Sequence, residues 1–125
     1  MRLLLDTHIF LWAVAGDRRL KKVVRRTMQM AQEVYVSAAS IWEISIKSAI
    51  GKLSVEPAVL IDAIKRAGFI ALPITIEHVA EVANLPPHHA DPFDRMLIAQ
   101  ASKEPLHLLT ADRQLAVYSP LVLLV

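Results

Sequence analysis

The sequence predicts an α/β fold built on a mostly parallel sheet. Short apolar runs of strand length alternate along the chain with longer segments in which apolar residues recur every three or four positions, as in amphipathic helices. Strands that alternate with helices in this way pair in parallel through right-handed crossovers. In such sheets ligands bind beyond the carboxyl ends of the strands, so functional side chains are expected there.

The expected elements follow one another in this order: strand Arg2–Leu5, helices His8–Ala15 and Arg18–Glu33, strand Val34–Ser37, helices Ser40–Ile50 and Pro57–Ala67, strand Phe69–Leu72, helices Thr75–Asn84 and Asp91–Lys103, and strands Leu106–Leu109 and Pro120–Val125. The strands are short runs of apolar or β-forming residues. Gly51 and Gly68 follow helices, where glycine is common. Pro57 and Pro92 stand in first turns, which accept proline.

Length and composition describe one globular domain. The 125 residues (13.9 kDa) are expected to form a single domain spanning residues 1–125. Apolar residues make up 54% of the chain and charged residues 21%, which excludes a disordered protein. The longest apolar run, Ile9–Ala15, is far shorter than the ~20 residues that cross a bilayer, and Asp6 interrupts the opening stretch where a signal peptide would be apolar. We therefore expect no membrane segment.

Several classes of site are excluded by residues that the chain lacks. Cysteine is absent, which excludes disulfides, thiolate zinc sites and cysteine nucleophiles and is compatible with a reducing cytoplasm. No glycine cluster forms a phosphate-binding loop. The net charge is only +2, but six of the 14 basic residues fall between Arg18 and Arg26. Such a cluster attracts a phosphate polymer and equally suits the solvated face of a helix, so both interpretations stay open.

Four acidic residues stand where a parallel sheet would gather them. Asp6 and Asp112 follow the first and fourth strands. Glu43 lies one turn into the helix after the second strand, where it completes a capping box with Ser40, and Asp94 lies in the first turn of a helix, where the dipole favours it. Asp112 could cap a short turn. Asp6 has no such structural role, and an unpartnered carboxylate after a buried strand costs several kcal/mol.

Together these acids point to a divalent cation. If the first, second and fourth strands are neighbours, the four carboxylates converge on one pocket and repel one another. Mg²⁺ or Mn²⁺ would relieve this repulsion, because both accept carboxylate oxygens, waters and phosphate as ligands. Such ions activate water and stabilise the leaving oxygen of a phosphodiester. The pattern therefore predicts metal-assisted hydrolysis.

Four segments carry a more specific signal: LLLDTH at Leu3–His8, SAASIWE at Ser37–Glu43, DPFDR followed by LIAQA at Asp91–Ala101, and LTAD at Leu109–Asp112. One such piece is weakly specific, but all four in this order resemble a PIN-domain ribonuclease, most closely the VapC toxin type of toxin–antitoxin modules. The resemblance runs from the first residues to the last strand.

The resemblance implies a three-layer α/β/α sandwich with about five strands, Mg²⁺- or Mn²⁺-dependent endoribonuclease activity on RNA, inhibition by a cognate antitoxin, a homodimer and a cytoplasmic location. The family's acidic quartet, which binds the metal and carries the catalysis, falls on Asp6, Glu43, Asp94 and Asp112. Thr7 and Thr110 match supporting positions. Asp91 is additional, and a role as helix cap is favoured over a role in the metal shell.

Other residues near these motifs carry weaker signals. Three basic residues are candidate RNA contacts, with a solvated surface or an ion pair as the alternative: Lys47, Lys52 and Arg95. His88 and His89 could bind a transition metal with Asp91, but neighbouring residues rarely ligate one ion, so an exposed loop is favoured. Three aromatic residues are expected in the core or an interface: Phe10, Trp12 and Trp42. The apolar excess predicts a buried interface, which the resemblance implies to be a dimer face and an antitoxin groove, on Ile9–Ala15, Leu20–Val24 and Ile41–Ile50.

Three alternative functions are weighed against the nuclease. A non-catalytic PIN-like module that binds RNA or a partner is disfavoured by the complete quartet. A receiver-type signalling domain also gathers acids around Mg²⁺, but it requires paired acids after the first strand and a lysine after the last. Here Thr7 and His8 follow Asp6, and no lysine follows Lys103. A haloacid-type phosphatase would need an aspartate in place of His8.

Overall fold

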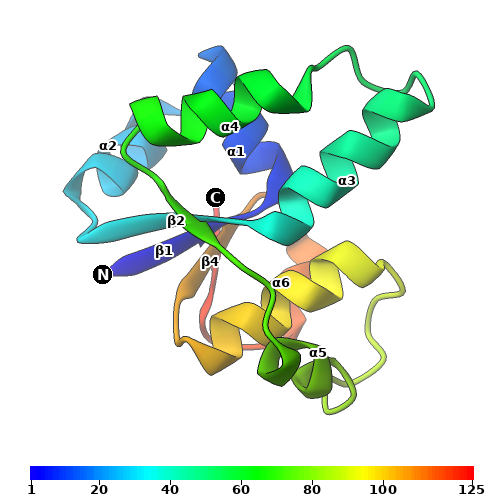
Figure 1. The fold of residues 1–125 in the computed structure, drawn as a ribbon. Helices are drawn as coiled ribbons and strands as arrows, with labels where there is room; N and C mark the ends of the chain where they lie inside the picture. The colour runs from blue at the N-terminus through cyan, green and yellow to red at the C-terminus, as the bar shows by residue number, and fades with distance from the viewer.

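A computed structural model describes all 125 residues of the chain. The elements follow in this order: β1 (Arg2–Leu5), α1 (Thr7–Ala15), α2 (Lys22–Met30), β2 (Glu33–Ser37), α3 (Ala38–Ala49), α4 (Pro57–Arg66), β3 (Ile70–Leu72), α5 (Ile76–Val82), α6 (Pro92–Lys103), β4 (His107–Thr110), a 3-10 helix (Arg113–Val117) and β5 (Val122–Leu124). Every expected strand and helix is present, which confirms the α/β class (Figure 1).

The five strands form one sheet in the order β3-β2-β1-β4-β5, and every pair is parallel. β1 lies in the middle, with Leu4 opposite Tyr35 of β2 on one side and Leu108 of β4 on the other. The chain first winds from β1 to β3 and then crosses back to place β4 on the free side of β1. The strand order therefore reverses between β1 and β4, and in such sheets ligands usually bind beyond the carboxyl ends of the strands at this point.

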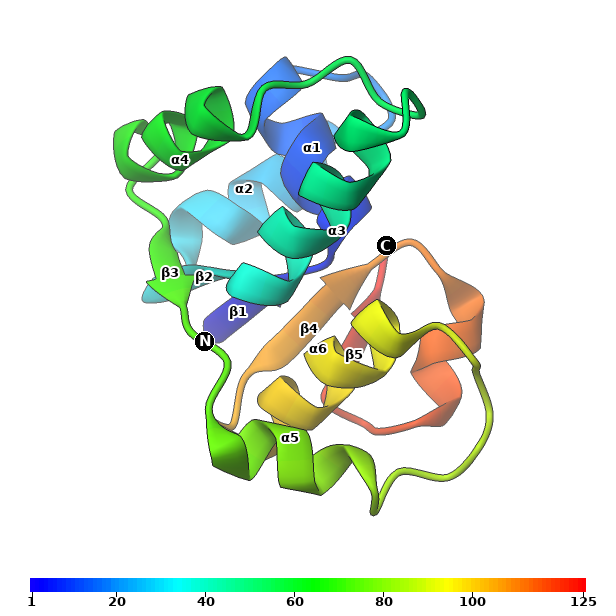
Figure 2. The same cartoon turned by 45° about the vertical axis from the view of Figure 1, so that its right-hand side comes forward.

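Helices cover both faces of the sheet, so the predicted three-layer sandwich is confirmed. Figure 2 shows α1 to α4 on one face and α5 and α6 on the other. Alternate residues of β1 face the two layers: Leu3 and Leu5 pack with the first helical layer, and Leu4 packs with the second. All three leucines are fully buried, so the central strand packs against both helical layers.

Two helices begin at least two residues away from the predicted start. The second helix starts at Lys22 rather than Arg18, because Asp17 accepts hydrogen bonds from the backbone N–H and the guanidinium of Arg19 and holds a turn there. The third starts at Ala38 with Ser37 as its N-cap, and the Ser37 hydroxyl oxygen accepts a hydrogen bond from the Ala39 N–H. The predicted capping box of Ser40 and Glu43 is therefore wrong.

The apolar side chains are distributed between core and surface differently from the prediction. Phe10 is buried as expected, but the stretches predicted as interface also place Leu20, Val24 and Ile44 in the core. Trp42, by contrast, is 59% exposed on α3, so of its two expected places the structure contradicts the core and leaves the interface. Exposed apolar residues on that helix include Trp42, Ile46 and Ile50. None of the helices has the length and apolar character needed to span a membrane.

The packing of β1 between the two helical layers leads to a stability prediction. Leu4→Ala removes a fully buried side chain from the centre of the sheet, and we expect a loss of about 2–5 kcal/mol in the free energy of unfolding. The matched control is Leu124→Ala on β5, where the leucine is 45% exposed and a loss below about 1 kcal/mol is expected. Urea unfolding measures both. Equal losses would contradict the placement of Leu4 between the two layers.

Candidate active site

The carboxyl end of β1 carries a buried carboxylate with two hydrogen-bond donors. Asp6 follows β1 directly and is 5% exposed. It caps helix α1 by accepting a hydrogen bond from the Ile9 N–H at 2.8 Å, and it accepts a second one from the hydroxyl of Thr110, the last residue of β4. The cap role was missed from the sequence, although an aspartate directly before an apolar helical segment is the usual signal.

Burial dominates the electrostatics of this carboxylate. Loss of hydration raises the pKa of Asp6 above its ordinary value, and the negative charge of nearby Asp112 raises it further. The hydrogen bonds from Thr110 and Ile9 act in the opposite direction and lower it. Thr110 also accepts a hydrogen bond from the Asp112 N–H at 3.0 Å, so one threonine positions two of the four predicted acids.

Glu43 enters the same region from α3, where it is 5% exposed. The Thr7 hydroxyl donates to Glu43 Oε1 at 2.8 Å, and Lys47 one turn later donates from Nζ to Oε2 at 2.6 Å. Ser40, far from capping the helix, lies buried with its Oγ 3.0 Å from the Thr7 hydroxyl oxygen. A lysine and a hydroxyl therefore fix both oxygens of this carboxylate, and Thr7 has the supporting contact that the sequence predicts.

Asp94 lies in the first turn of α6, on the opposite helical layer. Asp91 is the N-cap of that helix and accepts hydrogen bonds from the N–H groups of Phe93 and Asp94, so the favoured cap role of Asp91 is what the structure shows. Burial, together with the negative charges of Asp91 and Glu43, raises the pKa of Asp94 to about 6. A hydrogen-bond contact with His89 at 2.9 Å partly offsets this effect.

These local contacts join the four predicted acids into one constellation. Asp6 and Asp112 share Thr110, and ligand atoms of Asp94 and Asp112 lie within 4.8 Å of one another. The negative charge of Glu43, on α3, also acts on Asp94 and raises its pKa. Asp112 also caps the short 3-10 helix, as its position before Leu115 suggests, by accepting a hydrogen bond from the Gln114 N–H. The structure thus brings Asp94 and Asp112 within ligand distance of one another and places Asp6 and Glu43 beside them, outside that cluster.

The donor set fits a hard divalent cation. Carboxylate oxygens dominate it, and Mg²⁺ and Mn²⁺ are bound in proteins by a few carboxylates with waters and phosphate. Burial, and to a lesser extent the neighbouring carboxylates, raises the pKa values of Asp6 and Asp94, so the fold alone does not fully stabilise these two charges. Asp6, Asp94 and Asp112 are the candidate ligands, with Glu43 beside them.

The three basic residues predicted as RNA contacts lie at different distances from the acids and have different partners. Lys47 lies at the site, paired with Glu43, and Lys52 is exposed just beyond α3. Arg95 instead donates hydrogen bonds to backbone carbonyls of the loop between α5 and α6, including those of Val82 and Pro86, so its guanidinium is committed to the fold rather than free for RNA.

The two adjacent histidines have different environments. His88 is exposed, as predicted, and its ring lies edge-on to that of Tyr118. His89 contacts Asp94 and has a side chain only 21% exposed, so the expectation of a fully exposed loop is wrong for this residue. Its closeness in sequence to Asp91 and Asp94 is the one signal that could have found it.

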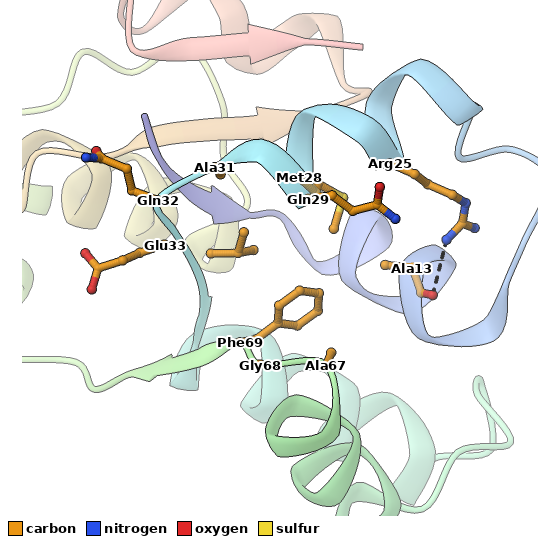
Figure 3. A pocket seen from close by; sticks show the side chains of 11 residues that line it. Ala13, Arg25, Met28, Gln29, Ala31, Gln32, Glu33, Ala67, Gly68 and Phe69 are labelled. Carbon is orange, nitrogen blue, oxygen red and sulfur yellow. Dashed lines mark hydrogen bonds between the residues drawn. The ribbon is translucent and has the colours of Figure 1, made fainter.

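A hollow of about 370 Å³ lies away from these acids, near the amino ends of β2 and β3. It opens between α2, the start of β2 and the turn before β3, and Figure 3 shows Met28 and Phe69 in its wall. Its one carboxylate, Glu33, pairs with Arg2. The guanidinium of Arg25 donates to the Ala13 carbonyl. No second acid lines it, so the gathered acids lie elsewhere, at the carboxyl ends of β1 and β4.

The raised pKa of Asp94 leads to a prediction for the metal-free protein. A carboxyl pKa of about 6, above the ordinary 3.8, means that the folded state binds the proton more tightly than the unfolded chain. Asp94 therefore favours folding below about pH 4, and this contribution is lost as the pH rises through 6. In chelator, Asp94→Asn should be more stable than the wild type by about 1–2 kcal/mol at pH 8, after solvent screening is allowed for, and the gain should vanish toward pH 4.

Chemical unfolding of both proteins at several pH values provides the measurement. Asp62→Asn is the matched control, because Asp62 is exposed and pairs with Arg66 on α4. That control should show no pH-dependent gain. A gain for Asp94→Asn that is constant with pH would contradict the pKa assignment.

Comparisons with known proteins agree with this geometry. The sequence model of the PIN domain family matches residues 3–119. No curated protein sequence matches the chain significantly. Solved structures similar in fold include a chain of VapBC2 from Rickettsia felis bound to a promoter DNA fragment (TM-score 0.74, 14% identity, covering 100% of this chain and 98% of that one) and a toxin–antitoxin complex from Klebsiella pneumoniae (TM-score 0.68, 17% identity, covering 97% and 95%).

A third similar structure is DNA-bound VapBC from Salmonella typhimurium (TM-score 0.69, 13% identity, covering 100% of this chain and 97% of that one). At these identities the structural matches establish the fold, and the match of the family model over nearly the whole chain establishes the family. Since the acidic residues of its motifs also meet at one end of the sheet, this chain belongs to the PIN domain family.

Proposed function

We propose that this chain is a Mg²⁺- or Mn²⁺-dependent endoribonuclease and the toxin of a toxin–antitoxin module. The observation that carries the proposal is the convergence of Asp6, Glu43, Asp94 and Asp112 at the carboxyl ends of β1 and β4. In the proposed reaction, water hydrolyses an RNA phosphodiester bond. The cytoplasm, where RNA is abundant, is the proposed location.

A bound divalent ion would activate water and neutralise charge on the phosphate. The chain's own residues hold this chemistry in place. Thr110 and the Ile9 N–H orient Asp6, and the Asp91 cap orients the first turn that carries Asp94. Because these donors are backbone groups or buried hydroxyls, the carboxylates are preorganised before substrate arrives.

Positive charge near the acids supports an RNA substrate. Lys47 pairs with Glu43 but keeps 39% of its side chain exposed, so its ammonium lies at the rim of the site. Lys52 is exposed nearby, and its N–H donates to the Lys47 carbonyl. These two lysines are the proposed phosphate contacts. The basic stretch from Arg18 to Arg26 is mostly exposed and adds a further phosphate-attracting surface.

A groove beside the acids supports the toxin assignment. It has a volume of about 510 Å³ and is lined by apolar side chains of α1 and of the segment after α3, among them Leu11, Trp12 and Leu53. Thr7 and Lys47, which both contact Glu43, also line it. We propose an apolar segment of the antitoxin as the occupant, because the structural relatives are toxin–antitoxin complexes and a chain in this groove would reach the acids.

The exposed apolar side chains of α3, Trp42, Ile46 and Ile50, are the proposed homodimer face. They lie outside the groove, so a dimer leaves the groove free for the antitoxin. Native mass spectrometry of the free protein should show a dimer.

The catalytic proposal predicts the effect of Asp6→Asn. Asparagine caps a helix as well as aspartate does and keeps a partner for Thr110, so this substitution removes the charge while preserving the fold. With Mg²⁺ or Mn²⁺, cleavage of RNA by the antitoxin-free protein should fall by about 100-fold or more, and chelator should abolish cleavage by the wild type.

The control is Asp62→Asn, which changes an exposed aspartate on α4 and should leave cleavage unchanged. If the wild type cleaves no RNA with either ion, or if Asp6→Asn cleaves as fast as the wild type, the nuclease proposal fails. Circular dichroism confirms that each variant is folded.

The groove proposal predicts the effect of Trp12→Ala. Large aromatic residues often dominate binding interfaces, so affinity for the co-expressed antitoxin should fall about 10-fold or more, while RNA cleavage by the free protein should change little. Trp42→Ala, on the exposed face of α3, is the matched control and should retain antitoxin affinity. Binding curves for the two variants provide the measurement. A larger loss for Trp42→Ala would place the antitoxin elsewhere.

A further inference from the structure

The loop between α5 and α6 brings an imidazole to the acidic centre. His89 Nε2 lies 2.9 Å from Asp94 Oδ2, and ligand atoms of His89, Asp94 and Asp112 all lie within 4.8 Å of one another. Ligands at about 2.1 Å from one ion are about 3 Å apart when adjacent and about 4.2 Å apart when opposite. The three side chains are thus spaced almost as a shared coordination shell would require.

We propose that His89 is a nitrogen ligand of the divalent ion held by Asp94 and Asp112, and that it shifts the preference of this centre from Mg²⁺ toward Mn²⁺. The inference rests on the metal centre of the proposed function and adds a ligand to it. Mg²⁺ strongly prefers oxygen ligands, whereas imidazole is a good ligand for first-row transition ions. One nitrogen in a carboxylate shell therefore strengthens Mn²⁺ binding more than Mg²⁺ binding.

Hydrogen bonds from two other elements hold the backbone of His89. They therefore fix the position of its ring. Its carbonyl accepts hydrogen bonds from the Tyr118 hydroxyl at 3.3 Å and from the Arg95 guanidinium at 3.5 Å. Arg95 also donates to the carbonyls of Val82 and Pro86, at 3.1 and 3.0 Å. The loop is thereby tied to α6 and to the end of the 3-10 helix, which run beside it in Figure 2. A ligand position needs this kind of support from surrounding residues.

The adjacent histidine, His88, has a different environment and no contact that would suit a metal ligand. His88 is exposed, and its ring stands edge-on to Tyr118 with centroids 5.2 Å apart. It makes no contact with the acids. Only one of the two adjacent imidazoles thus faces the centre, which removes the objection that neighbouring residues rarely share an ion. His88 also supplies a control that differs from His89 by a single position.

The test uses the full chain loaded with Mn²⁺ at pH 8 in the absence of RNA. Pulsed electron paramagnetic resonance detects hyperfine coupling between Mn²⁺ and a ligating ¹⁴N nucleus. We expect this coupling in the wild type and in His88→Gln, and its loss in His89→Gln. Calorimetry should show that His89→Gln weakens Mn²⁺ binding by about 10-fold or more and Mg²⁺ binding by less than about 3-fold.

Two results would overturn the inference. One is the absence of nitrogen coupling in the wild type, a result that does not depend on whether any variant folds. The other is an equal loss of affinity for both ions in His89→Gln, which would make His89 only a hydrogen-bonding support of Asp94. Coupling that persists in His89→Gln would likewise assign the nitrogen to another residue.

A further variant separates this inference from the proposed function. Asp112→Asn should lose affinity for both ions if the acids form a metal centre. If it binds Mn²⁺ as the wild type does, the metal centre and the proposed nuclease both fail. If it loses Mn²⁺ while the wild type shows no nitrogen coupling, only the role of His89 fails.

Discussion

The burial of Asp6 at the end of the central strand is the constraint on which the rest of the site depends. A carboxylate in this position must be hydrogen-bonded, because the loss of hydration is costly. The bond from the Ile9 N–H fixes where α1 begins, and the bond from Thr110 ties the end of β1 to the end of β4. Because Thr110 also accepts from the Asp112 backbone, the same contact places a second acid. The buried carboxylate of Asp6 thus fixes the start of α1, joins the ends of β1 and β4, and through Thr110 helps to position Asp112.

The fold compensates only part of the negative charge that it gathers. Lys47 pairs with Glu43, and His89 contacts Asp94, but no lysine or arginine pairs with Asp6. Burial together with this remaining charge raises the pKa values of Asp6 and Asp94, so the two ionised carboxylates lower the free energy of unfolding of the metal-free protein at neutral pH. Proteins keep such local conflicts at functional sites. In the proposed function, a bound cation neutralises these carboxylates, and the same negative charge then favours binding of the ion.

The two helical layers contribute different parts of the site. The layer of α1 to α4 supplies Glu43, Lys47 and the apolar groove, while the layer of α5 and α6 supplies Asp94 and the fastened loop with His89. The sheet lies between them and supplies Asp6 and Thr110. In the proposed function, RNA meets residues from all three layers, and an antitoxin in the groove lies against the first layer, where Thr7 and Lys47 connect it to Glu43.

The α/β class, the order of the elements and the positions of four acids near strand ends could be predicted without the structure, because apolar spacing and residues at strand ends are local signals. Prediction from the sequence failed where two local signals compete. Ser37 and Ser40 both suit a helix start, and only the pairing of β2 with β3 decides for Ser37. It also failed where the partner is distant in sequence: Thr110 meets Asp6 across 104 positions, and Arg95 is occupied by carbonyls of a loop rather than by a ligand. The role of His89 was likewise decided by tertiary structure, because only the fastened loop turns one of two adjacent histidines toward the acids.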